Sequence, residues 1–203
     1  MIGKWLLSFG LLVATSGLSL AETEIGKAAP NFTLPDTNGK EQSLANFKGK
    51  YVVLEWYNPD CPFVGKHYRS GNMQGLQKEF TSKGVVWLSI DSSAPGEEGN
   101  YPPGKLNEIS ARDGAARTAL LLDPAGKVGR LYGAKTTPDM YVISPDGVLV
   151  YKGAIDSKRS TDLADVKTAT NYVKSALVAV MTGKPVTTSD TRPYGCSVKY
   201  SSN

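Results

Sequence analysis

The chain is expected to fold around Tyr51-Val52-Val53-Leu54-Glu55-Trp56-Tyr57-Asn58-Pro59-Asp60-Cys61-Pro62-Phe63. Residues 51–57 form a nearly continuous apolar run, which is typical of a parallel strand covered on both faces. Pro62 suits the first position of a helix, because the N–H that proline lacks is one that a helix leaves unpaired. The segment therefore predicts a buried strand, a short loop and a helix, with Cys61 at the N-cap.

Cys61 is the first candidate for a chemical role. The N-terminus of a helix carries a partial positive charge, and the backbone N–H groups of Phe63 and Val64 are expected to point at the sulfur, which would favour the thiolate. The alternative is a buried cysteine that acts as a small hydrophobic residue. Because Asp60 and two prolines flank Cys61, we expect it to be accessible rather than buried.

Further strands follow on both sides of this segment. Residues 84–90 and 118–122 read as buried strands, and the helix from Pro62 is expected to break at Ser70-Gly71-Asn72 before it resumes. A strand, helix and strand at this spacing predict a right-handed parallel crossover. The polar segment 91–104 leaves the same sheet edge as Cys61, and it is either a binding loop or lid or a solvated insertion.

The second half of the chain changes pattern. Residues 140–143 and 148–151 flank Pro145-Asp146-Gly147, which predicts an antiparallel hairpin. Residues 162–181 predict one long amphipathic helix that stops at Gly183. The positions expected to face inward on this helix are Leu163, Val166, Val173, Leu177 and Val180.

Length, charge and the N-terminus indicate one exported domain. The chain has 203 residues and a net charge of +4 with no long basic run, so no nucleic-acid partner is expected. Residues 1–21 predict a signal peptide with cleavage after Ser19-Leu20-Ala21, and no stable membrane span after cleavage. The predicted domain covers 22–183 and a tail covers 184–203. Export, most simply to a periplasm, places the protein where disulfides persist.

The chain has two cysteines, Cys61 and Cys196. If they pair, the bridge is either a structural one or a catalytic one that opens and closes, and the sequence leaves both possibilities open. A third possibility is a copper carrier in which the two thiolates and His67 bind Cu(I). His67 lies nearly two turns along the helix from Cys61, so we expect it at the surface or behind the site rather than paired with the sulfur.

Several of these features together resemble a known fold. The order of elements, the cysteine at the start of a helix, Thr137-Pro138 and the Asp146-Gly147 hairpin resemble the thioredoxin fold, an α/β fold with a central mixed sheet flanked by helices. Residues 26–63 resemble the redoxin branch, which includes peroxiredoxins and the alkyl hydroperoxide reductase/thiol-specific antioxidant proteins. The segments 61–68 and 195–200 resemble an exported, peroxiredoxin-like subgroup of that branch.

The resemblance implies roles for particular residues. It makes Cys61 the attacking thiol and Pro138 a cis residue, so that the backbone of Thr137 can accept a substrate strand. It makes Glu55 a buried acid that handles protons, although Glu55 could instead pair with a lysine or arginine. The substrate would also meet Asn58, Pro62 and Phe63.

The chain also departs from the resembled families. Val64 stands where thioredoxins have a second cysteine, Asn58 stands where peroxiredoxins have Thr or Ser, and no arginine lies in the Thr137-Pro138 segment. We therefore expect an exported antioxidant-type thiol oxidoreductase that acts on a protein disulfide or a peroxide. Cys196 would resolve the intermediate and an external thiol would be the reductant, with no cofactor and no metal. A copper carrier and a structural Cys61–Cys196 bridge remain the alternatives.

Overall fold

The central sheet has five strands in the order β5-β4-β3-β7-β8. The computed structural model describes residues 23–202, so the predicted signal peptide lies outside the described residues. Strands β3 (Val52–Trp56), β4 (Val86–Asp91) and β5 (Ala119–Leu122) are parallel, whereas β7 (Asp139–Ile143) and β8 (Leu149–Gly153) are antiparallel to their neighbours. The predicted mixed α/β fold of thioredoxin type is confirmed.

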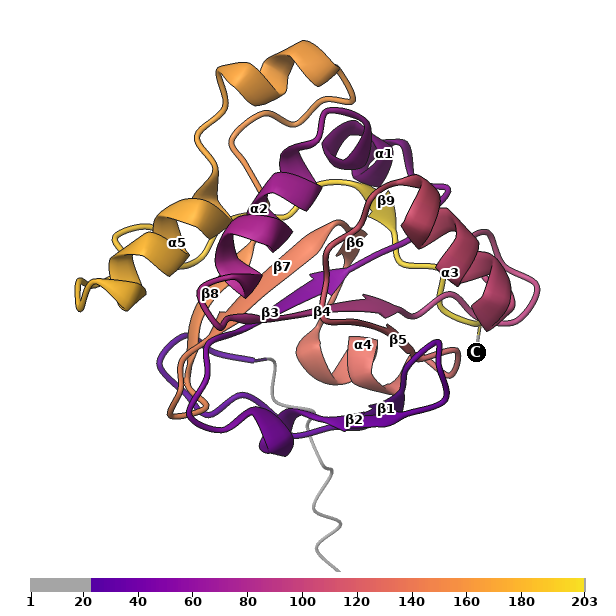
Figure 1. The fold of residues 1–203 in the computed structure, drawn as a ribbon, viewed down its shortest axis with the longest axis horizontal. Helices are drawn as coiled ribbons and strands as arrows, with labels where there is room; N and C mark the ends of the chain where they lie inside the picture. The colour runs from indigo at the N-terminus through magenta and orange to yellow at the C-terminus, as the bar shows by residue number, and fades with distance from the viewer. Residues whose placement is uncertain (1–22, 203) are drawn as a thin grey trace, which may run out of the picture.

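Two layers cover the sheet because β3 alternates its side chains between two apolar clusters. Val53 and Tyr57 pack with α1 (Pro62–Arg69), α2 (Asn72–Thr81) and α5 (Tyr172–Met181). Leu54 and Trp56 pack on the other face with α4 (Lys127–Tyr132) and with the hairpin of β1 (Thr33–Pro35) and β2 (Glu41–Ser43). Figure 1 shows these layers, with α3 (Pro103–Arg112) at the sheet edge.

The break that the sequence predicts between the first two helices is present at Gly71. This residue has a φ of 74°, in the left-handed region that glycine adopts without strain. The short 3₁₀ helix η1 (Leu44–Phe47) precedes β3. Within residues 23–202, no helix is long and apolar enough to cross a bilayer.

The long helix predicted over 162–181 is wrong. The segment forms a short 3₁₀ helix, η2 (Leu163–Lys167), and then the separate helix α5. The side chain of Asn171 accepts a hydrogen bond from the N–H of Lys174 and caps α5. This polar residue therefore starts a new helix at a point where the apolar periodicity predicted an uninterrupted one. As a result Leu163 is 40% exposed and does not face the core.

The tail is docked on the body of the protein. Strand β9 (Cys196–Ser197) pairs antiparallel with β6 (Thr136–Thr137), placing Cys196 opposite Thr137. Farther along, the N–H of Ala94 donates to the carbonyl of Lys199 at 2.8 Å, and the hydroxyl of Tyr200 donates to the carbonyl of Ala134 at 2.9 Å. Figure 1 shows the tail crossing from α5 to β9 beside β6.

Candidate functional site

The site is centred on Cys61, which is the N-cap of α1 as predicted. The side chain of Asn58 shapes the loop before it, because its oxygen accepts the N–H of Asp60 at 2.8 Å. The amide nitrogen of Asn58 donates to the carbonyl of Glu98 at 2.8 Å and so ties this loop to segment 92–102. The structure therefore places Asn58 as a link between two loops.

Two expectations about Cys61 are wrong. Its side chain makes no capping hydrogen bond to the helix N–H groups, and the residue is only 1% exposed. The sulfur instead lies 3.0 Å from the carbonyl oxygen of Thr137 and 2.6 Å from the sulfur of Cys196. The prediction of exposure failed because the docked tail covers the corner where β3 meets α1.

The predicted cis peptide between Thr137 and Pro138 is confirmed. It places the carbonyl of Thr137 over Cys61 and leaves the edge of β6 to pair with β9. A Cβ atom on Gly195 would lie 2.0 Å from the carbonyl oxygen of Thr137, so only glycine lets the tail approach this closely. Gly195 therefore allows Cys196 to reach Cys61.

Cys196 keeps its proton near neutral pH. Burial, together with the neighbouring Cys61 sulfur, raises the pKa of the Cys196 thiol to about 12. Both cysteines are free thiols in this structure. The two sulfurs lie 2.6 Å apart, so Cys61 and Cys196 are placed to form a bridge with each other during thiol-disulfide exchange.

Glu55 is fully buried and accepts hydrogen bonds from four side chains. Hydrogen bonds to its two carboxylate oxygens are donated by Tyr68 Oη at 3.0 Å, Trp87 Nε1 at 2.8 Å, Ser89 Oγ at 2.7 Å and Gln77 Nε2 at 3.2 Å. The buried guanidinium of Arg117 lies 4.4 Å from the ring centre of Tyr57 and 5.5 Å from that of Tyr68. Tyr68 of this network belongs to the same buried cluster as Cys61, and none of the four donors is a cysteine.

A second buried network anchors the tail. The hydroxyl of Tyr194 donates to Asp156, whose other carboxylate oxygen lies 3.6 Å from Lys66 Nζ. Lys66 also donates to the carbonyl of Lys158 at 2.8 Å. Phe63 packs edge-on against the ring of Tyr194, with centroids 5.9 Å apart, so this expected substrate-binding residue contacts the tail.

His67 belongs to the same buried network, so of the two predicted positions the surface one is wrong, and the ring is not paired with the Cys61 sulfur, as expected. Its Nδ1 lies 2.9 Å from the amide nitrogen of Asn72, and its Nε2 lies 3.4 Å from the hydroxyl of Tyr194. These partners suit a neutral ring that accepts at Nδ1 and donates at Nε2. Burial lowers the pKa of His67 to about 4.

The pH dependence of stability tests this assignment. Between about pH 6.5 and pH 4, the unfolded chain protonates His67 and the folded chain does not, so its contribution is complete above pH 6.5 and is lost as the pH falls. Relative to His67→Gln, the wild type should lose about 1.4 kcal/mol of unfolding free energy per pH unit in this window. Urea unfolding of both proteins measures the difference.

Two other groups titrate in the same window, which is why the comparison is made against a variant. Burial raises the pKa of Asp91 to about 6 and of Asp139 to about 7, and these carboxyl groups change stability with the opposite sign. Their effects cancel in the difference between the two proteins. Parallel stability curves for wild type and variant would show that His67 is not held neutral.

A cavity of about 600 Å³ reaches Cys61. The acceptor oxygen of Gln74, which is buried and has no hydrogen-bond partner in the structure, belongs to a residue of its lining. Pro62 is an exposed part of the same lining. The remaining lining residues are Pro59, Asp60, Gly65, Tyr68, Arg69, Arg112 and Asp113.

The structure gives the copper-carrier alternative no assembled ligand set among the described residues. Within residues 23–202, no group of three or more His, Cys, Asp and Glu side chains is placed to hold an ion. His67 faces Asn72 and Tyr194, so it does not complete a ligand set with the two cysteines.

The sequence missed the residues that hold the tail and the buried acid. Arg117, Lys66 and Asp156 are charged residues that pattern reasoning places at the surface, and only the fold shows them buried. The one available signal was Pro193-Tyr194-Gly195-Cys196, in which an aromatic residue and a glycine precede the second cysteine.

A cysteine at the start of the first crossover helix, facing a cis-proline on a mixed sheet, defines a thioredoxin-like redox protein. The sequence profile of the AhpC/TSA family matches residues 25–152, and the chain belongs to that family.

The chain is also similar to individual proteins, two of them named as redox proteins and one known from a solved structure. The chain is 28% identical over 127 residues to the thiol-disulfide oxidoreductase ResA of Bacillus thuringiensis, covering 63% of this chain and 68% of that protein. It is 47% identical over 152 residues to a chloroplastic peroxiredoxin Q of Triticum aestivum, covering 64% and 68%. A solved structure of an uncharacterised conserved protein from Geobacillus kaustophilus is 25% identical, with a TM-score of 0.74 over 90% of this chain and 95% of that one.

Proposed function

We propose that this protein is a thiol-disulfide oxidoreductase in which Cys61 attacks a substrate disulfide and Cys196 resolves the mixed disulfide. The observation that carries the proposal is the 2.6 Å separation of the two sulfurs, with β9 paired to β6. The tail is an extended strand that presents a sulfur to Cys61 beside a cis-proline, as a disulfide substrate would have to do. The relatives named thiol-disulfide oxidoreductase support this reading.

The exchange proceeds in two steps. Deprotonated Cys61 attacks one substrate sulfur, the substrate S–S bond breaks, and the other sulfur leaves as a thiolate. Cys196 then attacks the Cys61 sulfur, its proton passes to the departing thiolate, and the second substrate thiol is released. The substrate gains two electrons, the cysteine pair becomes a disulfide, and an external thiol reductant restores the pair.

Reduction of a peroxide is the second candidate, supported by the cavity that reaches Cys61 and by the family. Cys61 would attack the peroxide, the O–O bond would break with release of an alcohol or water, and a sulfenic acid would form. Cys196 would attack this sulfur and release water, which yields the same bridge. Asn58 would have to leave the carbonyl of Glu98 to contact the peroxide.

Export after cleavage near Ala21 belongs to the same proposal, because an oxidising compartment holds the disulfide substrates that the pair would meet. Glu55 is proposed to act from behind Cys61, and Thr137, Pro138, Pro62 and Phe63 to form the substrate surface once the tail withdraws.

Titration of the reduced wild-type protein tests the function. One equivalent of a small aromatic disulfide should consume both thiols and release two equivalents of the aromatic thiol, and mass spectrometry should find a Cys61–Cys196 bridge within one chain. Hydrogen peroxide gives the peroxide arm of the same test. Loss of a single thiol, or bridges only between chains, would contradict the resolving role of Cys196.

A further inference from the structure

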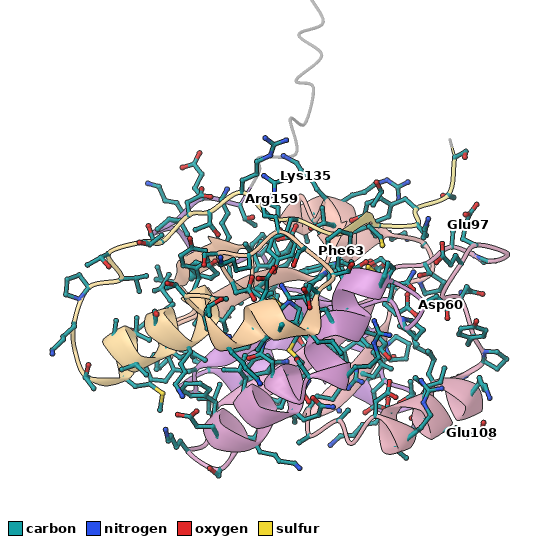
Figure 2. The ribbon with its side chains drawn as sticks, turned by 90° about the horizontal axis from the view of Figure 1, so that it is seen from above. Asp60, Phe63, Glu97, Glu108, Lys135 and Arg159 are labelled. Atoms are coloured by element: carbon teal, nitrogen blue, oxygen red, sulfur yellow. The ribbon has the colours of Figure 1, made fainter. Side chains whose placement is uncertain are left out.

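A second cavity lies apart from the two cysteines. It has a volume of about 480 Å³, and its walls come from α4, β6, β7, β8, the loop after β8 and tail residues 190–195. It shares no lining residue with the cavity at Cys61, and neither cysteine lines it. Figure 2 shows two of its lining residues, Lys135 and Arg159, on the same side of the molecule, away from Glu108.

The lining of this cavity is rich in positive charge. Its four basic side chains are Lys135, Lys152, Arg159 and Arg192, and its two acidic ones are Asp139 and Asp190. Both acids already have partners. Asp190 lies 3.6 Å from Lys152 Nζ, and the buried carboxylate of Asp139 accepts the backbone N–H of Lys135 at 3.0 Å.

Two of these basic groups, both guanidinium groups, have no interaction partner in the described part of the chain. Within residues 23–202, the side chains of Arg159 and Arg192 make neither an ion pair nor a hydrogen bond, and both residues are exposed. Guanidinium groups bind phosphate and carboxylate through paired hydrogen bonds. A hollow of this volume falls in the range of small-molecule sites.

We propose that this cavity binds a small polyanion, a molecule carrying at least two phosphate or carboxylate groups, between Arg159 and Arg192. Arg159 belongs to the body of the protein, whereas Arg192 lies on the tail four residues before Cys196. A ligand held by both arginines joins the tail to the body. Because it binds only the docked arrangement, it stabilises that arrangement and holds Cys196 over Cys61.

Calorimetric titration tests the site with two probes, pyrophosphate for phosphate groups and citrate for carboxylate groups, at low ionic strength. At least one probe should bind wild-type protein at a single site. Arg159→Gln and Arg192→Gln should each weaken binding about tenfold, since each removes a charge-assisted hydrogen-bond partner. Which probe binds identifies the chemistry of the ligand.

Lys184→Gln is the matched control. Lys184 is an exposed tail residue outside the cavity, so its variant loses the same charge and should bind within about twofold of wild type. The proposal is overturned if neither probe binds, or if the Arg159→Gln, Arg192→Gln double variant binds as wild type does.

The coupling to the tail has its own readout, the rate at which iodoacetamide alkylates Cys196 in a Cys61→Ser background. The bound probe should slow alkylation severalfold, and the double arginine variant should abolish the slowing. An unchanged rate with bound probe refutes the coupling. Both measurements are independent of turnover, so their outcome does not depend on the proposed redox function.

Discussion

Replacing Cys61 by serine is expected to lower turnover with disulfide and peroxide substrates by at least about a thousandfold, because a serine hydroxyl ionises far less than a thiol and is a much poorer nucleophile. Serine is close in size to cysteine and is a favourable N-cap, so the fold should remain. Substrate consumption with a thiol reductant in excess measures the effect, and circular dichroism checks the fold.

The companion variant Cys196→Ser separates attack from resolution. Cys61 should still react once, but the adduct should persist because no second sulfur lies 2.6 Å away to displace it. Mass spectrometry should then find one substrate moiety on Cys61 and little turnover. Full turnover in both variants would sink the proposed mechanism, and full turnover in Cys196→Ser alone would make an external thiol the resolving group.

Replacing Glu55 by alanine is expected to lower the free energy of unfolding by about 3 to 5 kcal/mol. The substitution leaves four buried donors without their acceptor and removes a carboxylate that interacts electrostatically with buried Arg117. Breaking a buried charged network costs about this much. Urea unfolding of both proteins measures the change.

Glu108→Ala is the matched control, because the side chain of Glu108 is 72% exposed and makes a surface pair with Lys105. Its unfolding free energy should stay within about 0.5 kcal/mol of wild type. Glu55→Gln tests proton handling separately. It keeps one acceptor oxygen, and a changed pH profile of thiol oxidation would favour a role in proton transfer, whereas an unchanged profile would favour a purely structural role.

The local sequence pattern was sufficient to predict several elements of the fold. Within the run from Tyr51 to Tyr57, Val52–Trp56 forms a strand covered on both faces. Gly71 separates the first two helices, and Pro145-Asp146-Gly147 closes the predicted hairpin. In each case a residue's own backbone preference agrees with the packing around it.

The local sequence pattern failed where the side chain of a polar residue decides where a helix begins. The apolar spacing over 162–181 predicted one continuous helix, but a separate helix begins after Asn171. The spacing could not show this, because a capping hydrogen bond leaves no periodic signal in the sequence. Local pattern also could not predict that His67 and Lys66 are buried, because their burial depends on partners at Asp156 and Tyr194 that lie far along the chain.

The sequence by itself determined the α/β order of strands and helices and the position of Cys61 at the start of a helix, because strand, turn and helix signals are carried by neighbouring residues. The cis-proline was implied only by the resemblance to the thioredoxin fold. Only the tertiary structure decided that Cys196 faces Cys61, that the tail covers the site and that Arg159 and Arg192 line one cavity. Those facts depend on contacts between segments far apart in the chain, and the close approach of Gly195 to Thr137 that makes them possible is visible only once the chain has folded.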